Sequence, residues 1–352
     1  MLRILLFCSL SLCVGAISSA YVFHQLSASK LPPLPAAASV ELQSAIENTA
    51  FRSVAAIKLM KPQTDEQWQK LLGVLSSQAP VSLEGLSSQF GVSISKEKIA
   101  GVPVYRVKPD DLGTSNALFV YVHGGAYVYG GGDRAAREAA VIAFYSGIET
   151  IAIDYRMPPE FPQPAAIDDV GLVYRHLLDQ NPSRKIGLGG TSAGGGLSMA
   201  AIHSFKAKQW PLPAALYLGT PWADVTKSSD TLYTNEGIDR VLNTYDGVIE
   251  SAAALYANGL DLKDPSLSPI YGSFEDFPPT YLLSGTRDLL LSDTVRTHRK
   301  LREANIQAEL NVYEGLSHAE YVKELDTPES VQAYKELAVF LQRYLASKVT
   351  GS

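Results

Sequence analysis

Ser192 lies in the sequence GTSAG at residues 190–194, which has the G-x-S-x-G pattern of a serine nucleophile in acyl transfer. The pattern follows the apolar run KIGLGG, which predicts a buried strand that turns into a helix. Glycine fits such a turn because side chains beside the serine would collide with the strand and the helix. The hydroxyl then projects over the sheet, and the helix N-terminus favours negative charge there. A glycine-rich turn with an incidental serine gives the same pattern, so other residues must decide.

A serine hydroxyl reacts when a nearby base takes its proton, and histidine is the usual base. His318 lies in EGLSHAEY, directly after the last expected strand, and therefore at the same edge of the sheet as Ser192. The other five histidines lie in the N-terminal segment, in a glycine-rich loop or in helical patterns: His24, His123, His176, His203 and His298. We predict that His318 is the base and that His123 has a structural role in its loop.

The base in turn needs a carboxylate that fixes its tautomer and stabilises its charged form. Asp288 directly follows the expected strand TYLLSG, whereas Asp293 starts or lies in the next helix and Asp264 belongs to an irregular stretch. We therefore predict Asp288 as the acid. The resulting chain order of serine, acid and histidine is the order of the α/β-hydrolase triad.

Two glycines, Gly124 and Gly125, lie in the stretch YVHGGAYVYGGGD at residues 121–133, after another apolar run. A tetrahedral intermediate needs N–H donors for its oxyanion, and glycine lets backbone N–H groups face it without an obstructing side chain. The residue after the nucleophile, here Ala193, supplies a further N–H group in such sites. We predict that Gly124, Gly125 and Ala193 form an oxyanion hole.

The same stretch also fits part of a dinucleotide-binding pattern. Residues 130–135 match G-x-G-x-x-A, and Asp154 ends a later strand where a ribose-binding acid would lie. The match is weak because it starts well after the expected strand end near His123, and it leaves the serine, acid and base without a role. The chain lacks a P-loop pattern and a histidine pair with helical zinc spacing, so we predict no cofactor and no metal.

The composition is that of a globular protein with a sizeable core. The chain has 352 residues, 46% of them hydrophobic, and a formal net charge of −6. This mild acidity argues against nucleic acid as a partner, because phosphate binding needs a basic face. The expected strands, in chain order, are IAGVPVYRV, ALFVYVH, TIAIDY, KIGLGG, AALYLG, TYLLSG and AELNVY.

Residues 1–20 have the features of a targeting segment. They carry one early positive charge at Arg3, then a long apolar run, and end with small residues. This pattern predicts a signal peptide and a periplasmic or secreted protein. The alternative is an uncleaved membrane anchor, because the apolar character continues through residues 21–23. The chain's two cysteines, Cys8 and Cys13, lie in this segment, so a cleaved chain would hold neither a disulfide nor a thiolate metal site.

The remaining chain divides by pattern. Residues 21–38 are a linker rich in proline and alanine, and residues 39–95 are an N-terminal segment of helices. Over residues 96–350, short apolar strands alternate with amphipathic helices, which predicts an α/β domain whose mostly parallel sheet is covered on both faces. Residues 222–270 break this alternation, and an insertion of that length is typical of a lid or binding element, with its core at about 222–258.

Several of these motifs together resemble bacterial hormone-sensitive-lipase-like esterases of the α/β-hydrolase fold. The motifs are HGGAYVYGG, IDYRMPPEFPQPAAIDD, GTSAGG in its variant with threonine before the serine, DPSLSP, GTRDLLLSD and GLSH. The resemblance covers roughly residues 95–348. It implies that Ser192, Asp288 and His318 form the triad, and that the N-terminal helices and the insertion form a helical cap.

The resemblance also implies a function and its partners. The implied reaction is hydrolysis of small-molecule carboxylic esters of short to medium acyl chains through an acyl-enzyme, without a cofactor. Nucleic acid is not a partner, a membrane is one only through an uncleaved N-terminal segment, and a homodimer is left open. Two alternatives stand beside it: a hydrolase of lactones or acetylated natural products, and a non-catalytic small-molecule-binding protein on the same fold. The filled triad positions favour an enzyme.

Three positions qualify the resemblance. Ala126 replaces the third glycine of the family's loop, and the oxyanion hole is expected to survive if the φ angle of Ala126 is negative. Tyr127 is predicted to line or support the substrate pocket. His318 is followed by Ala-Glu-Tyr where many relatives have glycine and an aromatic residue, so the pocket is expected to differ there.

Overall fold

The computed structural model describes residues 31–50, 52–78, 80–111 and 116–346. The predicted signal peptide and the first part of the predicted linker lie outside these residues. Residues Met1–Pro35 and Ala36–Ser352 are separate units, and the second unit holds all the helices and strands discussed below. Within the described residues, no helix combines the length and the apolar character that crossing a bilayer would require.

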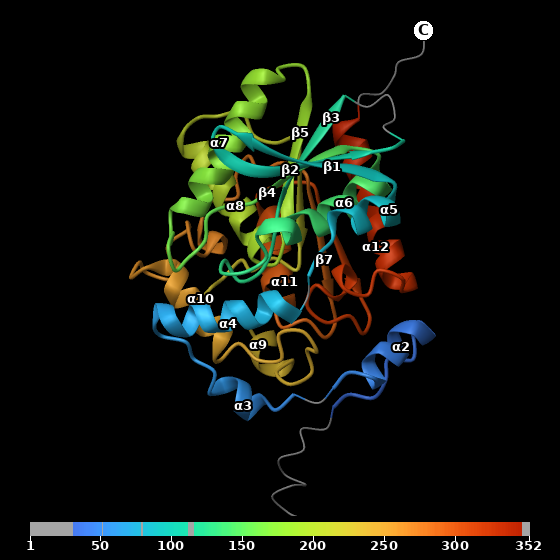
Figure 1. The fold of residues 1–352 in the computed structure, drawn as a ribbon, viewed down its shortest axis with the longest axis vertical. Coiled ribbons are helices and arrows are strands. Elements are labelled where there is room, and N and C mark those ends of the chain that lie inside the picture. The colour runs from blue at the N-terminus through green and yellow to red at the C-terminus, as the bar shows by residue number, and fades with distance from the viewer. Residues whose placement is uncertain (1–30, 51, 79, 112–115, 347–352) are drawn as a thin grey trace, which may run out of the picture. The chain divides into compact units, whose positions relative to one another are not determined.

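The centre of this unit is an eight-stranded sheet with the strand order β1-β2-β4-β3-β5-β6-β7-β8 (Figure 1). Both β1–β2 and β2–β4 pair antiparallel, and all other neighbours pair parallel, so the predicted mostly parallel sheet is confirmed. The strands span Val92–Ile99 (β1), Val102–Pro109 (β2), Ala117–Val122 (β3), Glu149–Ile153 (β4), Lys185–Thr191 (β5), Ala215–Gly219 (β6), Thr280–Gly285 (β7) and Ala308–Tyr313 (β8).

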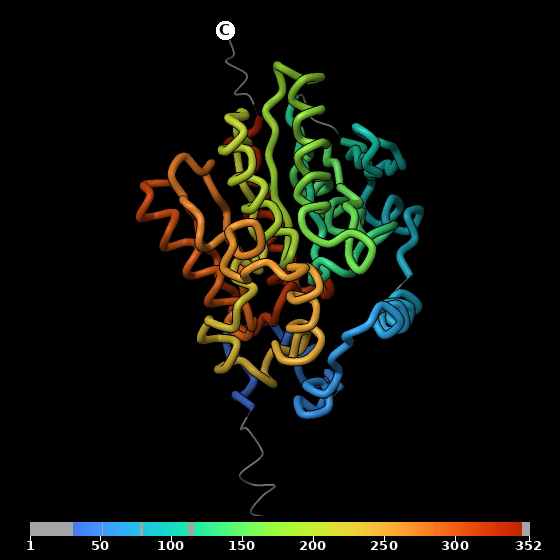
Figure 2. Tube along the Cα trace, turned by 90° about the vertical axis from the view of Figure 1, so that its left-hand side faces the viewer, coloured from blue at the N-terminus to red at the C-terminus, as the bar shows by residue number. Residues whose placement is uncertain are grey.

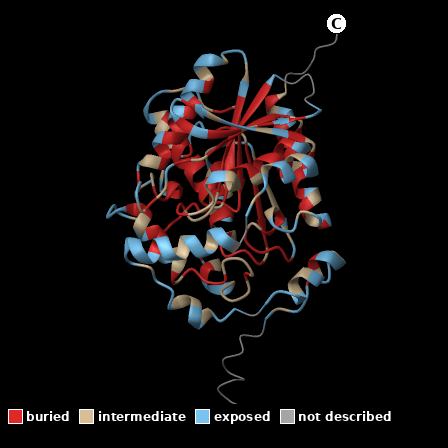
Figure 3. Cartoon of the chain, in the orientation of Figure 1, coloured by how far each residue is buried: buried red, intermediate tan, exposed pale blue. Residues whose placement is uncertain are grey.

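Helices cover both faces of the sheet, and each face has its own apolar cluster. Side chains alternate along a strand, so Val120 of β3 packs towards α7 and α8, whereas Phe119 packs towards α6 and α12. Figure 3 shows the sheet buried between the exposed outer faces of the helices. The covering helices span Leu83–Phe90 (α5), Ala136–Ser146 (α6), Ala165–Gln180 (α7), Ala193–Ala207 (α8), Leu291–Glu303 (α11) and Pro328–Leu345 (α12).

The boundary between the N-terminal helices and the sheet differs from the prediction. The run IAGVPVYRV does not form one strand, because Ala100 and Gly101, with φ angles of 50° and 87°, turn the chain between β1 and β2. β1 begins at Val92, so the helical segment predicted over 39–95 ends at Phe90. The polar sequence SISKEKI hides β1 from a hydrophobicity pattern because only the two end residues of this edge strand are buried.

Two segments far apart in the sequence lie at the same end of the sheet (Figures 1 and 2). One holds the N-terminal helices α2 (Val40–Glu47), α3 (Val54–Lys58) and α4 (Asp65–Gln78). The other connects β6 to β7 and holds α9 (Thr231–Thr234), α10 (Val248–Ala257) and the 3₁₀ turn η2 (Pro269–Tyr271). They meet where Trp68 of α4, 1% exposed, packs with Ala252 of α10 and with Val128.

Candidate active site

Ser192 occupies the sharp turn between β5 and α8, with φ 61° and ψ −124°. A non-glycine residue with such a positive φ is strained by about 1–3 kcal/mol, so surrounding contacts must hold it. The N–H of Ser192 donates to Gly219 O at 2.8 Å, and Ser192 O accepts from Trp222 N at 2.9 Å. A Cβ on Gly190 or Gly194 would overlap the carbonyl oxygen of Val122, because the end of β3 passes directly beside the turn. Steric exclusion thus explains both glycines of the motif.

The three residues predicted from separate motifs meet at the carboxyl edge of the sheet. His318 Nε2 lies 2.8 Å from Ser192 Oγ, and His318 Nδ1 lies 2.9 Å from Asp288 Oδ1. Asp288 is fully buried and His318 is 3% exposed, whereas Ser192 is half-buried. The hydroxyl is therefore the accessible end of a chain of polar groups that is otherwise shielded from water.

The Asp288 carboxylate is fixed by its own neighbours. Its Oδ2 accepts from Ser284 Oγ at 2.7 Å, and its Oδ1 accepts from Leu290 N at 2.8 Å. The alternative acid Asp293 lies in another network, where its Oδ2 accepts the N–H groups of Ala223 and Asp224, both at 3.0 Å. Burial raises the pKa of Asp293 to about 7.

The second alternative acid, Asp264, also has another partner. Its Oδ1 accepts the N–H of Ser266 at 2.8 Å, a local bond within the irregular stretch between α10 and η2. Of the three carboxylates weighed from the sequence, Asp288 is the one that the structure joins to His318.

Gly124 and Gly125 follow β3 and face the nucleophile turn. A Cβ on Gly124 would lie 2.7 Å from Thr191 O and 3.1 Å from Ser192 Cβ. Gly125 has φ 114°, and a Cβ there would overlap Tyr129 O. The chain therefore needs glycine at both positions to pack against other backbone, quite apart from any ligand. Neither N–H group donates to another group of the described chain, so both are free to face an oxyanion.

The next two residues show how the loop is built. Ala126 has φ 52°, a left-handed conformation, so the condition of a negative angle is not met. The Gly124 and Gly125 N–H groups stay free nonetheless, because the loop closes through Val128 N and Tyr129 N, which both donate to Gly125 O. The side chain of Tyr127 is 1% exposed and stacks on Tyr256 with ring centroids 3.9 Å apart, so it packs in the core.

His123 is buried beside this loop, as predicted for a structural histidine. Its Nδ1 donates to Gly124 O at 2.7 Å, and its ring stacks on Tyr155 with centroids 4.1 Å apart. Desolvation lowers the pKa of His123 to about 4. The acid of the rival dinucleotide pattern, Asp154, accepts the N–H of Gly132 at 2.9 Å, so it braces the glycine-rich loop internally.

A buried polar cluster lies beneath the nucleophile turn, and the sequence analysis missed it. Thr191 Oγ1 donates to Glu138 Oε1 at 2.8 Å and lies 3.0 Å from the hydroxyl of Tyr321. The Tyr217 hydroxyl donates to the same Glu138 oxygen at 3.0 Å. A Cβ on Gly219 would overlap these hydroxyl groups, so glycine leaves room for the cluster. The available signal was an acidic residue among the alanines on the apolar face of α6.

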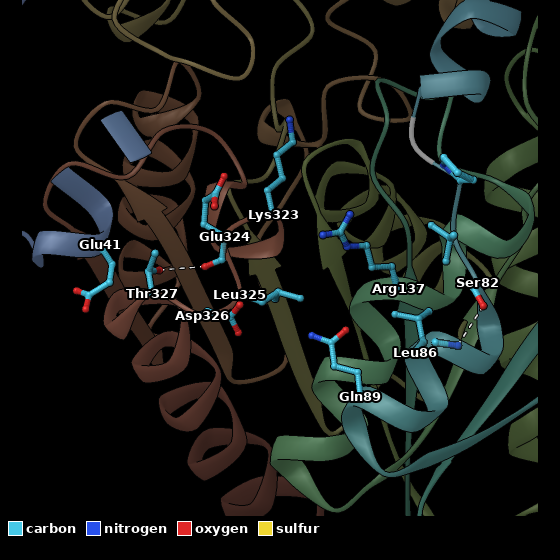
Figure 4. Close-up of a pocket in the computed structure, with 13 residues that line it drawn as sticks. Glu41, Ser82, Leu86, Gln89, Arg137, Lys323, Glu324, Leu325, Asp326 and Thr327 are labelled. Carbon is cyan, nitrogen blue, oxygen red and sulfur yellow. Dashed lines mark hydrogen bonds between the residues drawn. The ribbon is translucent and has the colours of Figure 1, made fainter. Parts of the chain in front are cut away.

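A pocket of about 490 Å³ contains none of the predicted site residues (Figure 4). It lies between α2, α5, the start of α6 and the segment before α12. Arg137 and Lys323 line it together with three acidic residues, so its charges offset one another. The lining residues are Glu41, Pro80, Val81, Ser82, Gly85, Leu86, Gln89, Arg137, Lys323, Glu324, Leu325, Asp326 and Thr327.

The depressed pKa of His123 predicts a pH-dependent loss of stability. The unfolded chain binds a proton at this residue below its usual pKa of 6.5, whereas the folded chain does so only near pH 4. His123 stabilises the fold fully above pH 6.5, and this contribution, roughly 3 kcal/mol, is lost as pH falls to about 4. Urea unfolding at pH 7 and pH 4.5 should show a smaller acid loss in His123→Gln than in the wild type. The exposed-residue control His176→Gln should behave like the wild type, and equal losses in all three proteins would contradict the assignment.

The cluster around Glu138 predicts that two buried threonine hydroxyls contribute unequally to the unfolding free energy. Thr191→Val removes a hydroxyl that joins Glu138 to Tyr321, and should lower the unfolding free energy by about 1–3 kcal/mol. The control Thr280→Val removes an equally buried hydroxyl whose bond to Pro278 O spans two residues, and should cost about 1 kcal/mol. Denaturant unfolding of both variants measures the difference. A smaller cost at Thr191 than at Thr280 would argue against the cluster.

Comparison with known proteins identifies the family. Residues 119–322 match a family model described as alpha/beta hydrolase fold. The crystal structure of an esterase E25 is 45% identical, with a TM-score of 0.86 over 89% of this chain and 97% of that chain. An esterase from the bacterial hormone-sensitive lipase family is 28% identical, with a TM-score of 0.72 over 88% of this chain and 99% of that chain.

A curated relative agrees with these structures. An acetyl-hydrolase of Streptomyces hygroscopicus is 33% identical over 190 residues, which make up 54% of this chain and 62% of that protein. The predicted resemblance is confirmed: the chain belongs to the α/β-hydrolase fold family, among the esterases related to bacterial hormone-sensitive lipase.

Proposed function

We propose that this protein hydrolyses carboxylic esters through an acyl-enzyme on Ser192, with His318 as general base and Asp288 as the acid that orients it. One observation carries the proposal: the Ser192 hydroxyl, half-buried on a strained turn, lies 2.8 Å from an imidazole whose other nitrogen lies 2.9 Å from a buried carboxylate. This arrangement activates a serine and has no evident use in a protein that only binds a ligand.

In the first step, Ser192 Oγ attacks the ester carbonyl carbon and its proton moves to His318 Nε2. The carbonyl π electrons move to oxygen, which becomes an oxyanion. Asp288 stabilises the imidazolium through the proton that His318 Nδ1 keeps. When the intermediate collapses, the bond to the alcohol oxygen breaks, His318 donates its proton to that oxygen, and the acyl group stays on Ser192.

The oxyanion is assigned to the N–H groups of Gly124, Gly125 and Ala193. Gly124 lies directly against the nucleophile turn, and Ala193 is the first residue of α8, whose N–H group has no acceptor within the helix. The start of α8 adds the favourable end of its dipole. Loss of one such donor typically costs about 2.7–4 kcal/mol of transition-state stabilisation.

In the second step, water replaces the alcohol. His318 Nε2 takes a proton from the water as its oxygen attacks the acyl carbon, and the same N–H donors hold the second oxyanion. Collapse breaks the bond to Ser192 Oγ, which regains its proton from His318, and the carboxylic acid leaves. The enzyme returns to its starting state without a cofactor.

The proposed substrates are esters with short to medium acyl chains. The name of the Streptomyces relative, acetyl-hydrolase, supports a small acyl group. The packing of Trp68 of α4 on Val128, in the loop that carries Gly124 and Gly125, supports a cap that restricts the site. Lactones and acetylated natural products are the second candidate class, since their carbonyl groups undergo the same two steps.

Ester hydrolysis by the chain without residues 1–20 tests this function. We expect turnover of p-nitrophenyl esters to peak at acetate to hexanoate and to fall towards palmitate. Ser192→Ala should lower kcat by about 10⁴-fold or more, because no other residue replaces the nucleophile. A fluorophosphonate probe should label the wild type and leave Ser192→Ala unlabelled. Activity retained in Ser192→Ala would refute the mechanism, and a wild type that is neither active nor labelled would favour the binding-protein alternative.

Export remains part of the proposal, resting on the pattern of residues 1–20. We expect the full-length chain, produced with a C-terminal tag in a bacterium, to appear outside the cytoplasm with an N-terminus close to Tyr21. N-terminal sequencing of the fractionated protein measures this. Recovery of the intact segment in the membrane fraction would support the anchor instead, and recovery of it in the cytoplasm would contradict export.

A further inference from the structure

Residues 231–240, in the connection between β6 and β7, contact the loop that carries Asp288. Asn235 Nδ2 donates to Asp288 O at 2.8 Å and to Thr286 O at 3.2 Å. Thr231 Oγ1 donates to Leu289 O at 2.8 Å. These bonds reach the backbone before and after Asp288, so the connection between β6 and β7 supports the loop that carries this residue.

Asp239, in the same segment, joins the acid loop to the base loop. Its side chain is fully buried. Its Oδ2 accepts the N–H of Leu289 at 2.9 Å and the N–H of His318 at 3.4 Å. Its Oδ1 accepts the N–H groups of Val241 and Leu242 at 2.8 and 2.9 Å, which fix the carboxylate to its own segment.

The next residue, Arg240, holds the base loop from the same side. Its N–H donates to Ser317 Oγ at 3.1 Å, and its guanidinium forms an ion pair with Glu320. The other oxygen of Glu320 accepts Ser317 N at 2.9 Å. Ser317 and Glu320, one residue before and two residues after His318, both bind Arg240. Glu320 lies in the Ala-Glu-Tyr sequence that directly follows His318, so this sequence has a partner in the connection.

Beyond the sheet, the loops of the acid and the base are joined through their first residues, where Gly315 N donates to Thr286 Oγ1 at 2.9 Å. Pairing of β7 with β8 ends at Gly285 and Tyr313, before the acid and the base. Beyond it, Thr286 N donates to Tyr313 O at 3.0 Å and Arg287 N donates to Leu316 O at 3.1 Å. Past these bonds, and among the residues that the structure describes, the Asp239 carboxylate contacts both the backbone next to Asp288 and that of His318.

We propose that Asp239 is a positioning residue that sets the geometry of the Asp288–His318 pair from the connection between β6 and β7. The inference rests on the proposed function and deepens it. Asp239 touches no reacting atom, and acts through backbone N–H groups and through its negative charge. The connection thereby becomes part of the acid–base machinery as well as part of the cap.

The charge of Asp239 acts within a defined set of neighbours. The charged or titratable groups around it are Asp288, His318, Arg240 and Lys323. Burial and the Asp288 carboxylate raise the pKa of Asp239, whereas His318 and the backbone donors lower it. When His318 takes the Ser192 proton in the transition state, the Asp239 carboxylate is a second negative charge close to the imidazolium that forms.

The test compares Asp239→Asn with the wild type in the chain without residues 1–20. Asparagine keeps the size of the side chain, but its amide nitrogen cannot accept an N–H. The variant therefore loses either the two bonds from Leu289 and His318 or the two bonds from Val241 and Leu242, together with the negative charge. We expect kcat for p-nitrophenyl butyrate to fall about 10–100-fold, because small misplacements of catalytic groups cost this much, with KM within about twofold. The acid limb of the kcat/KM profile should move to lower pH by about one unit.

A second variant separates geometry from charge. Asp239→Glu keeps the carboxylate but lengthens its arm, so it should lower kcat without moving the acid limb. It also supplies the test if Asp239→Asn does not fold. The control is Asp246→Asn, in the same connection, which breaks ion pairs with Lys58 and Lys227 and should leave kcat and the acid limb unchanged.

The outcomes separate this inference from the proposed function. Complete but slower fluorophosphonate labelling of Asp239→Asn, with a native circular dichroism spectrum, is the expected result. An unchanged kcat and acid limb in folded Asp239→Asn, or a loss of thermal stability alone, would overturn the positioning role while leaving the triad intact. A wild type that fails to react with the probe would overturn the proposed function itself.

Discussion

The strained turn at Ser192 is the constraint on which the rest of the site depends. Hydrogen bonds to Gly219 O and from Trp222 N hold the peptide groups on both sides of this residue, which has φ 61°. The end of β3 passes so close that Gly190 and Gly194 cannot carry side chains. The same strand continues into the loop of Gly124 and Gly125, so one close approach of backbone sets the nucleophile and its proposed oxyanion donors together.

Buried carboxylates connect segments that the hydrogen bonds of the sheet do not connect directly. Glu138 joins α6 to the nucleophile strand, Asp293 holds the backbone after β6, and Asp239 bridges the loops after β7 and β8. Burying a carboxylate is costly, and each is offset by hydrogen bonds from several donors. Moving one donor away leaves a buried carboxylate with an unsatisfied hydrogen-bonding site, so these contacts resist rearrangement. A stiff support suits a site in which proton transfer depends on distances near 2.8 Å.

Much of this could be predicted because the signals are local. G-x-S-x-G, the polar residues after TYLLSG and the histidine after the last strand each mark the end of a parallel strand, and such ends share one edge. What the sequence hid or left open has a different cause. Tyr127 packs on Tyr256, which is more than a hundred residues away, and β1 is a polar edge strand recognisable only beside β2. The φ angle of Ala126 is positive, a conformation that non-glycine residues rarely adopt and that its residue type does not signal.

The sequence by itself determined the fold class and pointed to Ser192, Asp288 and His318, because apolar periodicity and glycine-bounded turns depend on near neighbours in the chain. Its motifs also carried the resemblance to the family. Only the tertiary structure decided how those residues are held. Asp239 and His318 are 79 residues apart, and Thr191 and Tyr321 are 130 apart. Contacts of that kind depend on how strands stack and connections fold back, and a buried acid in a helix or loop looks in sequence like any solvated one.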